Sequence, residues 1–132
     1  MSLNRMIDEY NNLKVKLADQ MKVEFKSFFA NNPAIKGITW VQFTPHFNDG
    51  DPCCFGVNEF CPVYQDEEVE ALKEGETSYY DLEGQSENNP NLAEFIKSLT
   101  KLPDEIFETA FGDHAQIVAT SEGFHVSEWD HD

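Results

Sequence analysis

The first half of this 132-residue chain contains the run Trp40-Val41-Gln42-Phe43-Thr44-Pro45-His46-Phe47-Asn48-Asp49-Gly50-Asp51-Pro52-Cys53-Cys54-Phe55. Its two ends are rich in β-branched and aromatic residues, which is typical of strands. Its centre, Asn48-Asp49-Gly50, is a strong turn signal, because glycine tolerates positive φ and Asn and Asp side chains hydrogen-bond to nearby backbone. The run therefore predicts a β-hairpin in which Ile38–Phe43 pairs with Cys53–Phe60, with Trp40 in the core.

Upstream of this hairpin, the pattern predicts one long amphipathic helix. Apolar residues recur at intervals of three and four from Leu3 to about Phe29, which places them on one face of a helix. Asn31-Asn32-Pro33 ends the helix, because the residue before a proline disfavours helical geometry. Gly37 then opens the first strand.

An acidic stretch follows the hairpin. Residues 65–89 contain nine acids and one lysine, and we interpret them as an insert within a single domain that spans residues 1–132. Asp66–Glu74 has the spacing of a short helix with Val69 and Leu72 facing inward, and Gly75 ends it. The rest of the stretch reads as an irregular loop.

The remainder of the chain predicts two short helices and a second hairpin. Asn89 is a good N-cap for the first helix, and the second starts at Pro103 and closes at Gly112. Strands over 115–120 and 124–129 pair across a tight turn. The predicted fold is α+β: a long N-terminal helix, a four-stranded antiparallel sheet from two β-hairpins, and two shorter helices between them on one face (α-β-β-α-α-β-β).

Composition restricts the class of protein. The three cysteines, at positions 53, 54 and 61, are odd in number and two are adjacent, which favours buried reduced thiols over a disulfide framework. Nearby acids raise a thiol pKa, so a cysteine nucleophile is disfavoured. No apolar run approaches the ~20 residues of a membrane span. The polar N-terminus lacks the apolar region of a signal peptide, so we expect a cytoplasmic protein without membrane contact.

The charge is high and uneven. The formal net charge is −16, of which residues 62–132 carry −15 and residues 1–61 carry −1. Direct nucleic-acid binding needs a positive surface and is therefore disfavoured. The acidic half is either a solvated surface or a face that binds a basic partner protein, including one whose basic surface normally binds nucleic acid.

The acidic insert supplies the candidate partner-binding residues. Four of them are acids of the predicted helix, and two are tyrosines of the following loop, a residue type that anchors many interfaces. The set is Asp66, Glu67, Glu68, Glu70, Tyr79 and Tyr80.

A second group of residues suggests a divalent metal. Closely spaced oxygen ligands hold Ca²⁺ or Mg²⁺, and Asp-His pairs are common in metal sites because a carboxylate orients the imidazole. Here Asp113 precedes a histidine in such a pair. The spacing does not match an EF-hand, so the alternative interpretation is that these groups only shape turns and the surface. The candidate ligands are His46, Asp49, Asp51, His114, Asp130 and His131.

The central motif also suggests a family. The run from Trp40 to Phe55, followed by Phe111-Gly112-Asp113-His114 and by the acidic, histidine-containing end Trp129–Asp132, resembles a family of small uncharacterised proteins from bacteria and their phages. Its members share a Trp-x-Gln-aromatic-Thr-Pro-x-Phe-Asn-Asp-Gly-acid-Pro-Cys core. The resemblance implies a bacterial or phage origin, with the host cytoplasm as location for a phage protein, and it implies no particular activity.

Two functions from different classes follow from these features. The first is a non-enzymatic interaction protein without a cofactor, which binds a basic protein surface through its electronegative half, for example a host protein. The second is a small metal-binding protein or metal-dependent enzyme that uses the histidine and aspartate residues.

Overall fold

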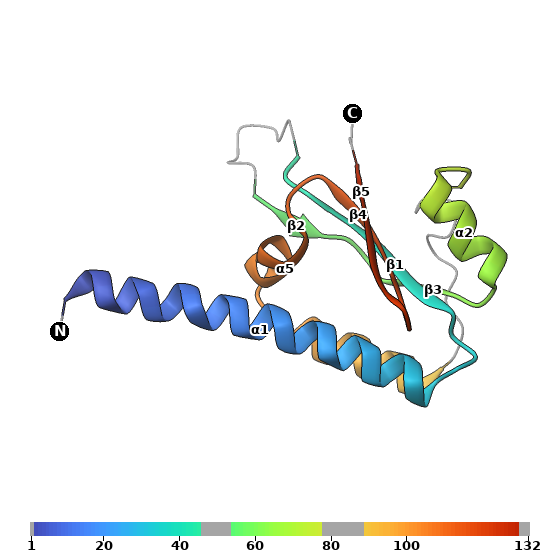
Figure 1. Ribbon diagram of the computed structural model, residues 1–132, viewed down its shortest axis with the longest axis horizontal. Helices are drawn as coiled ribbons and strands as arrows, with labels where there is room; N and C mark the ends of the chain where they lie inside the picture. The colour runs from blue at the N-terminus through green and yellow to red at the C-terminus, as the bar shows by residue number, and fades with distance from the viewer. Residues whose placement is uncertain (1, 46–53, 78–88, 130–132) are drawn as a thin grey trace.

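Helices and strands follow one another as the sequence predicts, with one strand more than expected. The computed structural model describes residues 2–45, 54–77 and 89–129 (Figure 1). Its elements are α1 (Leu3–Asn31), β1 (Gly37–Phe43), β2 (Gly56–Val57), β3 (Cys61–Val63), α2 (Asp66–Glu74), α4 (Pro90–Leu99), α5 (Asp104–Phe111), β4 (Ala115–Thr120) and β5 (Gly123–Glu128). The α+β class is confirmed. None of the helices in these three ranges has the length and hydropathy of a membrane-spanning segment.

The first helix is longer than the rest of the fold requires. α1 contains 29 residues, which corresponds to about 44 Å at 1.5 Å per residue. The Ser2 hydroxyl caps its start by accepting the Arg5 N–H at 3.3 Å. At its end, the Asn32 side-chain amide donates to the Phe28 carbonyl at 2.9 Å, and Pro33 follows. In Figure 1 the C-terminal half of α1 underlies the sheet, and the N-terminal half projects beyond it.

All described strands form one antiparallel sheet of order β2-β1-β4-β5, with β3 also paired to β1. The predicted return strand over Cys53–Phe60 is therefore divided and shifted along the chain. Gln42 lies opposite Val57, whereas Thr39 lies opposite Cys61, so the register moves by one residue between β2 and β3. Such an extra residue is the mark of a bulge, which interrupts a strand without ending its pairing.

Helices cover both faces of the sheet, whereas one covered face was predicted. Alternate residues of β1 point to opposite faces. Trp40 points toward α1, and Gly37, three residues earlier, faces α2. A Cβ atom at Gly37 would lie 3.0 Å from the Ala119 carbonyl oxygen and 3.3 Å from Val69 of α2. α2 therefore packs closely on the face opposite α1, α4 and α5.

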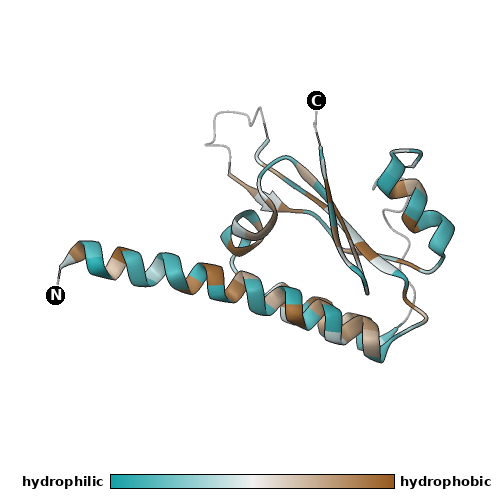
Figure 2. Cartoon of the chain, viewed as in Figure 1, coloured by the Kyte–Doolittle hydropathy of each residue, from teal (hydrophilic) through white to brown (hydrophobic). Residues whose placement is uncertain are grey.

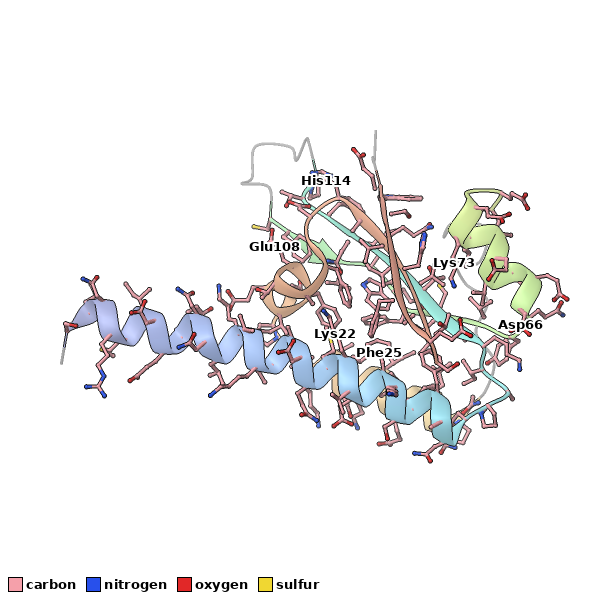
Figure 3. The ribbon with its side chains drawn as sticks, in the orientation of Figure 1. Lys22, Phe25, Asp66, Lys73, Glu108 and His114 are labelled. Atoms are coloured by element: carbon pink, nitrogen blue, oxygen red, sulfur yellow. The ribbon has the colours of Figure 1, made fainter. Side chains whose placement is uncertain are left out.

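Aromatic rings fill the layer between α1 and the sheet. Phe25 is 1% exposed and stacks on Trp40 with ring centroids 5.4 Å apart. The edges of Phe95 from α4 and Phe124 from β5 also meet Phe25, at 4.9 and 5.4 Å. Trp40 is fully buried, as predicted. One helix residue thus connects α1, α4, β1 and β5, and Figure 3 labels it at the centre of the molecule.

A buried amide joins α5 to the sheet. Gln42 is fully buried, and its Nε2 donates to the carbonyl oxygens of Phe107 at 2.9 Å and Gly112 at 2.7 Å. Its Oε1 accepts the Trp40 Nε1–H at 2.9 Å. A buried amide with all these partners avoids the cost of an unpaired polar group. Gly112 has φ 88°, a conformation that favours glycine, and it ends α5 as predicted.

Candidate interaction surfaces

The helix of the acidic insert has one buried and one acidic face. Val69 and Leu72 are buried against the sheet, as predicted, and Gly75 ends the helix with φ 79°. Asp66, Glu67 and Glu70 are exposed, and Glu68 is half-buried. Acids in the first turn are stabilised by the positive end of the helix dipole. Three of the predicted partner-binding carboxylates are therefore exposed on a folded helix, and Figure 3 labels one of them, Asp66.

Lysine neutralises little of this acidic face. Lys73 Nζ lies 3.9 Å from Glu70 Oε1, and the Glu70 side chain remains 64% exposed. Exposed pairs at this distance contribute little to stability. The two tyrosines of the predicted partner set, Tyr79 and Tyr80, lie outside the described residues.

Most of the predicted metal ligands also lie outside the described residues, namely His46, Asp49, Asp51, Asp130 and His131. The sixth, His114, immediately precedes β4 and has φ 51°. Its carbonyl oxygen accepts the Trp129 N–H at 2.7 Å. Within residues 2–45, 54–77 and 89–129, no three side chains of the metal-ligating types are close enough together to hold an ion.

Asp113, beside His114, has a structural role that explains its position. Its carboxylate accepts the Thr44 N–H at 2.8 Å, the Thr44 hydroxyl at 2.7 Å and the His114 N–H at 2.8 Å. Burial alone would raise the pKa of Asp113, but these hydrogen bonds and the nearby imidazole lower it below the usual 3.8. Asp113 thus fastens the end of β1 to the start of β4, at the end of the sheet where Trp129 follows β5.

The projecting half of α1 is a surface that the sequence analysis did not identify as exposed. We call residues 3–17 the arm. Most of its apolar side chains remain in solvent, with Leu3 72% and Leu13 53% exposed. Met6, Ile7, Tyr10 and Val15 are each about half exposed, and Leu17, at the end of the arm, is partly buried. Contiguous apolar surface of this kind marks interaction sites in many proteins. In Figure 2 hydrophobic residues recur along the whole of α1, including the part that projects.

One feature of the sequence distinguishes the arm from the rest of α1. Residues 3, 6, 10, 13 and 17 are apolar and alternate intervals of three and four, as in a coiled coil. The buried half uses a different pattern and different residues, mainly phenylalanine, at positions 21, 25, 28 and 29. The change from aliphatic residues to phenylalanine falls where the helix enters the core.

Tyr10 anchors the arm to the rest of the chain. Its hydroxyl donates to Glu105 of α5. The pKa of Tyr10 is raised, mostly by this hydrogen bond and to a smaller extent by burial and by the Glu105 charge. Lys14 Nζ lies 5.1 Å from the centre of the Tyr10 ring, and farther along α1, Lys22 Nζ lies 5.4 Å from the Phe111 ring.

An apolar groove begins where the arm ends. α4 runs antiparallel to α1: Asn91 donates to Asn32 at one end at 3.1 Å, and Phe95 stacks on Phe28 in the middle. Toward the other end, Leu17 and Met21 of α1 face Leu99 and Leu102 across a groove of about 390 Å³. Gln20 and Glu24 also line it.

The cysteines divide between core and surface. Cys61 is buried in β3, as predicted for a structural thiol, whereas Cys54 is exposed. Cys53 lies outside the described residues.

Comparison with known proteins found no relative: no family model, no curated protein and no solved structure matches this chain. The resemblance of the Trp40–Cys53 motif to a bacterial and phage family stays a prediction.

Proposed function

We propose that this chain is a non-enzymatic interaction protein that binds a basic protein surface through the acidic part of the molecule outside α1. The observation that carries the proposal is the separation of charge between α1 and the rest of the chain. Residues 1–31 contain four acids and five bases, a net charge of +1, whereas residues 32–132 contain 21 acids and four bases, a net charge of −17. We call residues 32–132 the body.

The position of α2 supports a role for the body in binding. It packs through Val69 and Leu72 and leaves Asp66, Glu67 and Glu70 in solvent. A carboxylate row held on a packed helix keeps its geometry, so a basic partner does not have to order it on binding. Long-range attraction to a basic surface speeds association and weakens as salt screens it.

The proposed setting is the cytoplasm of a bacterium, with the chain encoded by the bacterium or by a phage. A basic surface that binds nucleic acid is the preferred partner, because a net charge of −17 on 101 residues resembles the charge that such a surface recognises. Direct nucleic-acid binding by the chain itself is disfavoured, because it has nine lysine and arginine residues against 25 acids.

Calorimetric titration tests this proposal with a partner first captured on the immobilised chain from a bacterial lysate. We expect the Kd to rise at least about tenfold between 50 and 300 mM salt, because several charge pairs are screened together. Duplex DNA should compete with the chain for the partner. An affinity that is independent of salt would contradict the proposal.

A matched pair of variants locates the contact. The triple substitution Asp66→Asn, Glu67→Gln and Glu70→Gln removes three exposed charges from α2. The control, Asp8→Asn, Asp19→Asn and Glu24→Gln, removes three charges from α1. The α2 variant should weaken binding several-fold, by the loss of attractive pairs, and the α1 variant should not. Equal effects of the two variants would remove α2 from the contact.

A further inference from the structure

We propose that the arm is a self-association surface: two copies of this chain pair through their arms, antiparallel, and the first turn of each arm enters the α1–α4 groove of the other copy. This inference goes beyond binding of a basic partner and does not rest on it. Three observations support it. The first is the row of apolar side chains at positions 3, 6, 10, 13 and 17 of the arm, which we call the stripe. The others are the groove at the end of the stripe and the distribution of charge.

The spacing of the stripe matches a helix pair. Leu3, Met6, Tyr10, Leu13 and Leu17 occupy the alternating a and d positions of a heptad pattern. The stripe is continuous with the face of α1 that is buried farther along, at Met21 and Phe25. In that buried half α4 covers the face. Along the arm, α5 reaches the stripe at Tyr10 through Glu105, while Leu3, Met6 and Leu13 stay exposed. The arm is 15 residues long, or about 22 Å.

The groove determines the direction of the second helix. If Tyr10 of one arm lies opposite Leu13 of the other, antiparallel arms place Met6 opposite Leu17 and Leu3 opposite Gln20. Leu17 and Gln20 line the groove beside α4. The first turn of the second copy therefore meets the apolar walls formed by Met21, Leu99 and Leu102. A parallel pair would leave both grooves without this occupant.

Charge favours the same arrangement. Each body has a net charge of −17, and an antiparallel pair places the two bodies at opposite ends of the joined arms, beyond the roughly 8–10 Å over which charges act in physiological salt. A parallel pair would bring the bodies side by side. Each arm contains Arg5, Asp8, Glu9, Lys14 and Lys16, a net charge of +1, so the arms themselves repel little. The high overall charge therefore does not prevent pairing through this element.

The contact is small. Stable interfaces bury about 1,200–2,000 Å² in total, and a pair of four-turn helices with two filled grooves lies toward the lower end of that range. We therefore expect a dimer with a Kd in the roughly micromolar range. Each dimer would carry two acidic bodies, which gives a divalent ligand for a basic partner.

Sedimentation equilibrium of the full chain from about 1 to 100 μM tests the proposal. We expect a reversible monomer–dimer equilibrium. Met6→Lys and Leu13→Lys, each in the stripe and exposed in the monomer, should weaken dimerisation at least about tenfold, since each places two charges in the apolar seam. Val15→Lys is the control, because Val15 is 52% exposed but lies on the opposite side of the arm; it should leave the equilibrium unchanged. Circular dichroism checks that each variant is folded.

Charge swaps determine the orientation. In antiparallel arms Glu9 lies beside Lys16 of the second copy, whereas in parallel arms it lies beside Lys14. A symmetric dimer contains the Glu9–Lys16 pair twice, and Glu9→Lys removes both copies. The Kd of the dimer should therefore rise by roughly two- to thirtyfold. Adding Lys16→Glu should restore the affinity, and adding Lys14→Glu should not.

Three results would overturn the proposal: a monomer at 100 μM, an unchanged dimer in both stripe variants, or restoration by Lys14→Glu alone. Salt separates this proposal from the proposed function. Screening reduces repulsion between the bodies, so added salt should maintain or strengthen the dimer while it weakens binding of a basic partner.

Discussion

The two halves of α1 belong to one continuous helix but have opposite environments. In the C-terminal half, Phe25 is 1% exposed and touches rings from three other elements. In the N-terminal half, Leu13 is 53% exposed. Both residues lie on the apolar face, so amphipathic spacing identified the face correctly in each half. The difference teaches that apolar periodicity shows which side of a helix needs a partner, but not whether the partner is in the same chain.

The largest expected effect is on the free energy of unfolding, which substitutions in the two halves of α1 should change to different extents. Phe25→Ala removes the ring that joins α1, α4, β1 and β5, and should lower the free energy of unfolding by about 3–5 kcal/mol. Leu13→Ala should change it by less than about 0.5 kcal/mol when the chain is monomeric, because the residue is exposed. Urea unfolding at low micromolar concentration measures both. Similar losses in the two variants would mean that the arm packs against the body.

The same comparison can be made with two glutamines. Gln42 is buried and bonds to Trp40 and to two carbonyl groups at the end of α5, whereas Gln20 is exposed and bonds to Glu24 of its own helix. Gln42→Leu leaves buried polar groups unpaired and should cost about 1–3 kcal/mol. Gln20→Leu should be nearly neutral for unfolding in urea. A neutral Gln42→Leu would show that water replaces the lost hydrogen bonds.

A smaller effect concerns pH. The folded pKa of Asp113 lies below its ordinary value, so its carboxylate contributes stability that is fully present above the unfolded pKa near 3.8 and is lost as pH falls through the folded pKa. Because the Asp113 side chain is 32% exposed, we expect at most about 1 kcal/mol. Asp113→Asn should flatten the fall in unfolding free energy between pH 5 and pH 2. If Asp113→Asn left the dependence of the unfolding free energy on pH unchanged in this range, the Thr44 hydrogen bonds would not favour the charged form of Asp113.

The smallest expected effect concerns divalent ions. An interaction protein without a metal site should melt at the same temperature, within about 1 °C, in chelator and in millimolar Mg²⁺, Ca²⁺, Mn²⁺ or Zn²⁺, because only an ion that prefers the folded state raises stability. Thermal unfolding followed by circular dichroism measures this. An increase of several degrees with one ion, abolished by His114→Ala, would favour the metal-binding alternative.

Local signals predicted most of the elements correctly. Asn89 caps α4 by accepting the Leu92 N–H at 3.1 Å, α2 spans Asp66–Glu74 as predicted, and Gly75 and Gly112 end their helices at positive φ. Helix ends depend on residues a few positions apart, so neighbouring residues suffice to place them.

Features that depend on contacts between distant parts of the chain could not be predicted from local sequence. The division of the return strand into β2 and β3 depends on pairing with β1 across the sheet. Nothing local to α2 indicated that it would cover the face opposite α1. The sequence identifies Asp113 as one member of an Asp-His pair, but its hydrogen bonds to Thr44 span 69 positions of sequence.

The order of helices and strands, the charge of each half and the apolar face of α1 follow from the amino-acid sequence, because each depends on residue types and on spacing along one segment. Tertiary structure decided which half of that face is buried. Burial requires a second surface, and here α4 returns along α1 only as far as Leu17 and Met21. Beyond that point α4 gives no cover, α5 reaches the arm at Tyr10 through Glu105, and Leu3, Met6 and Leu13 remain exposed. The exposed arm thus results from where α4 ends, because the apolar face itself continues along the whole of α1.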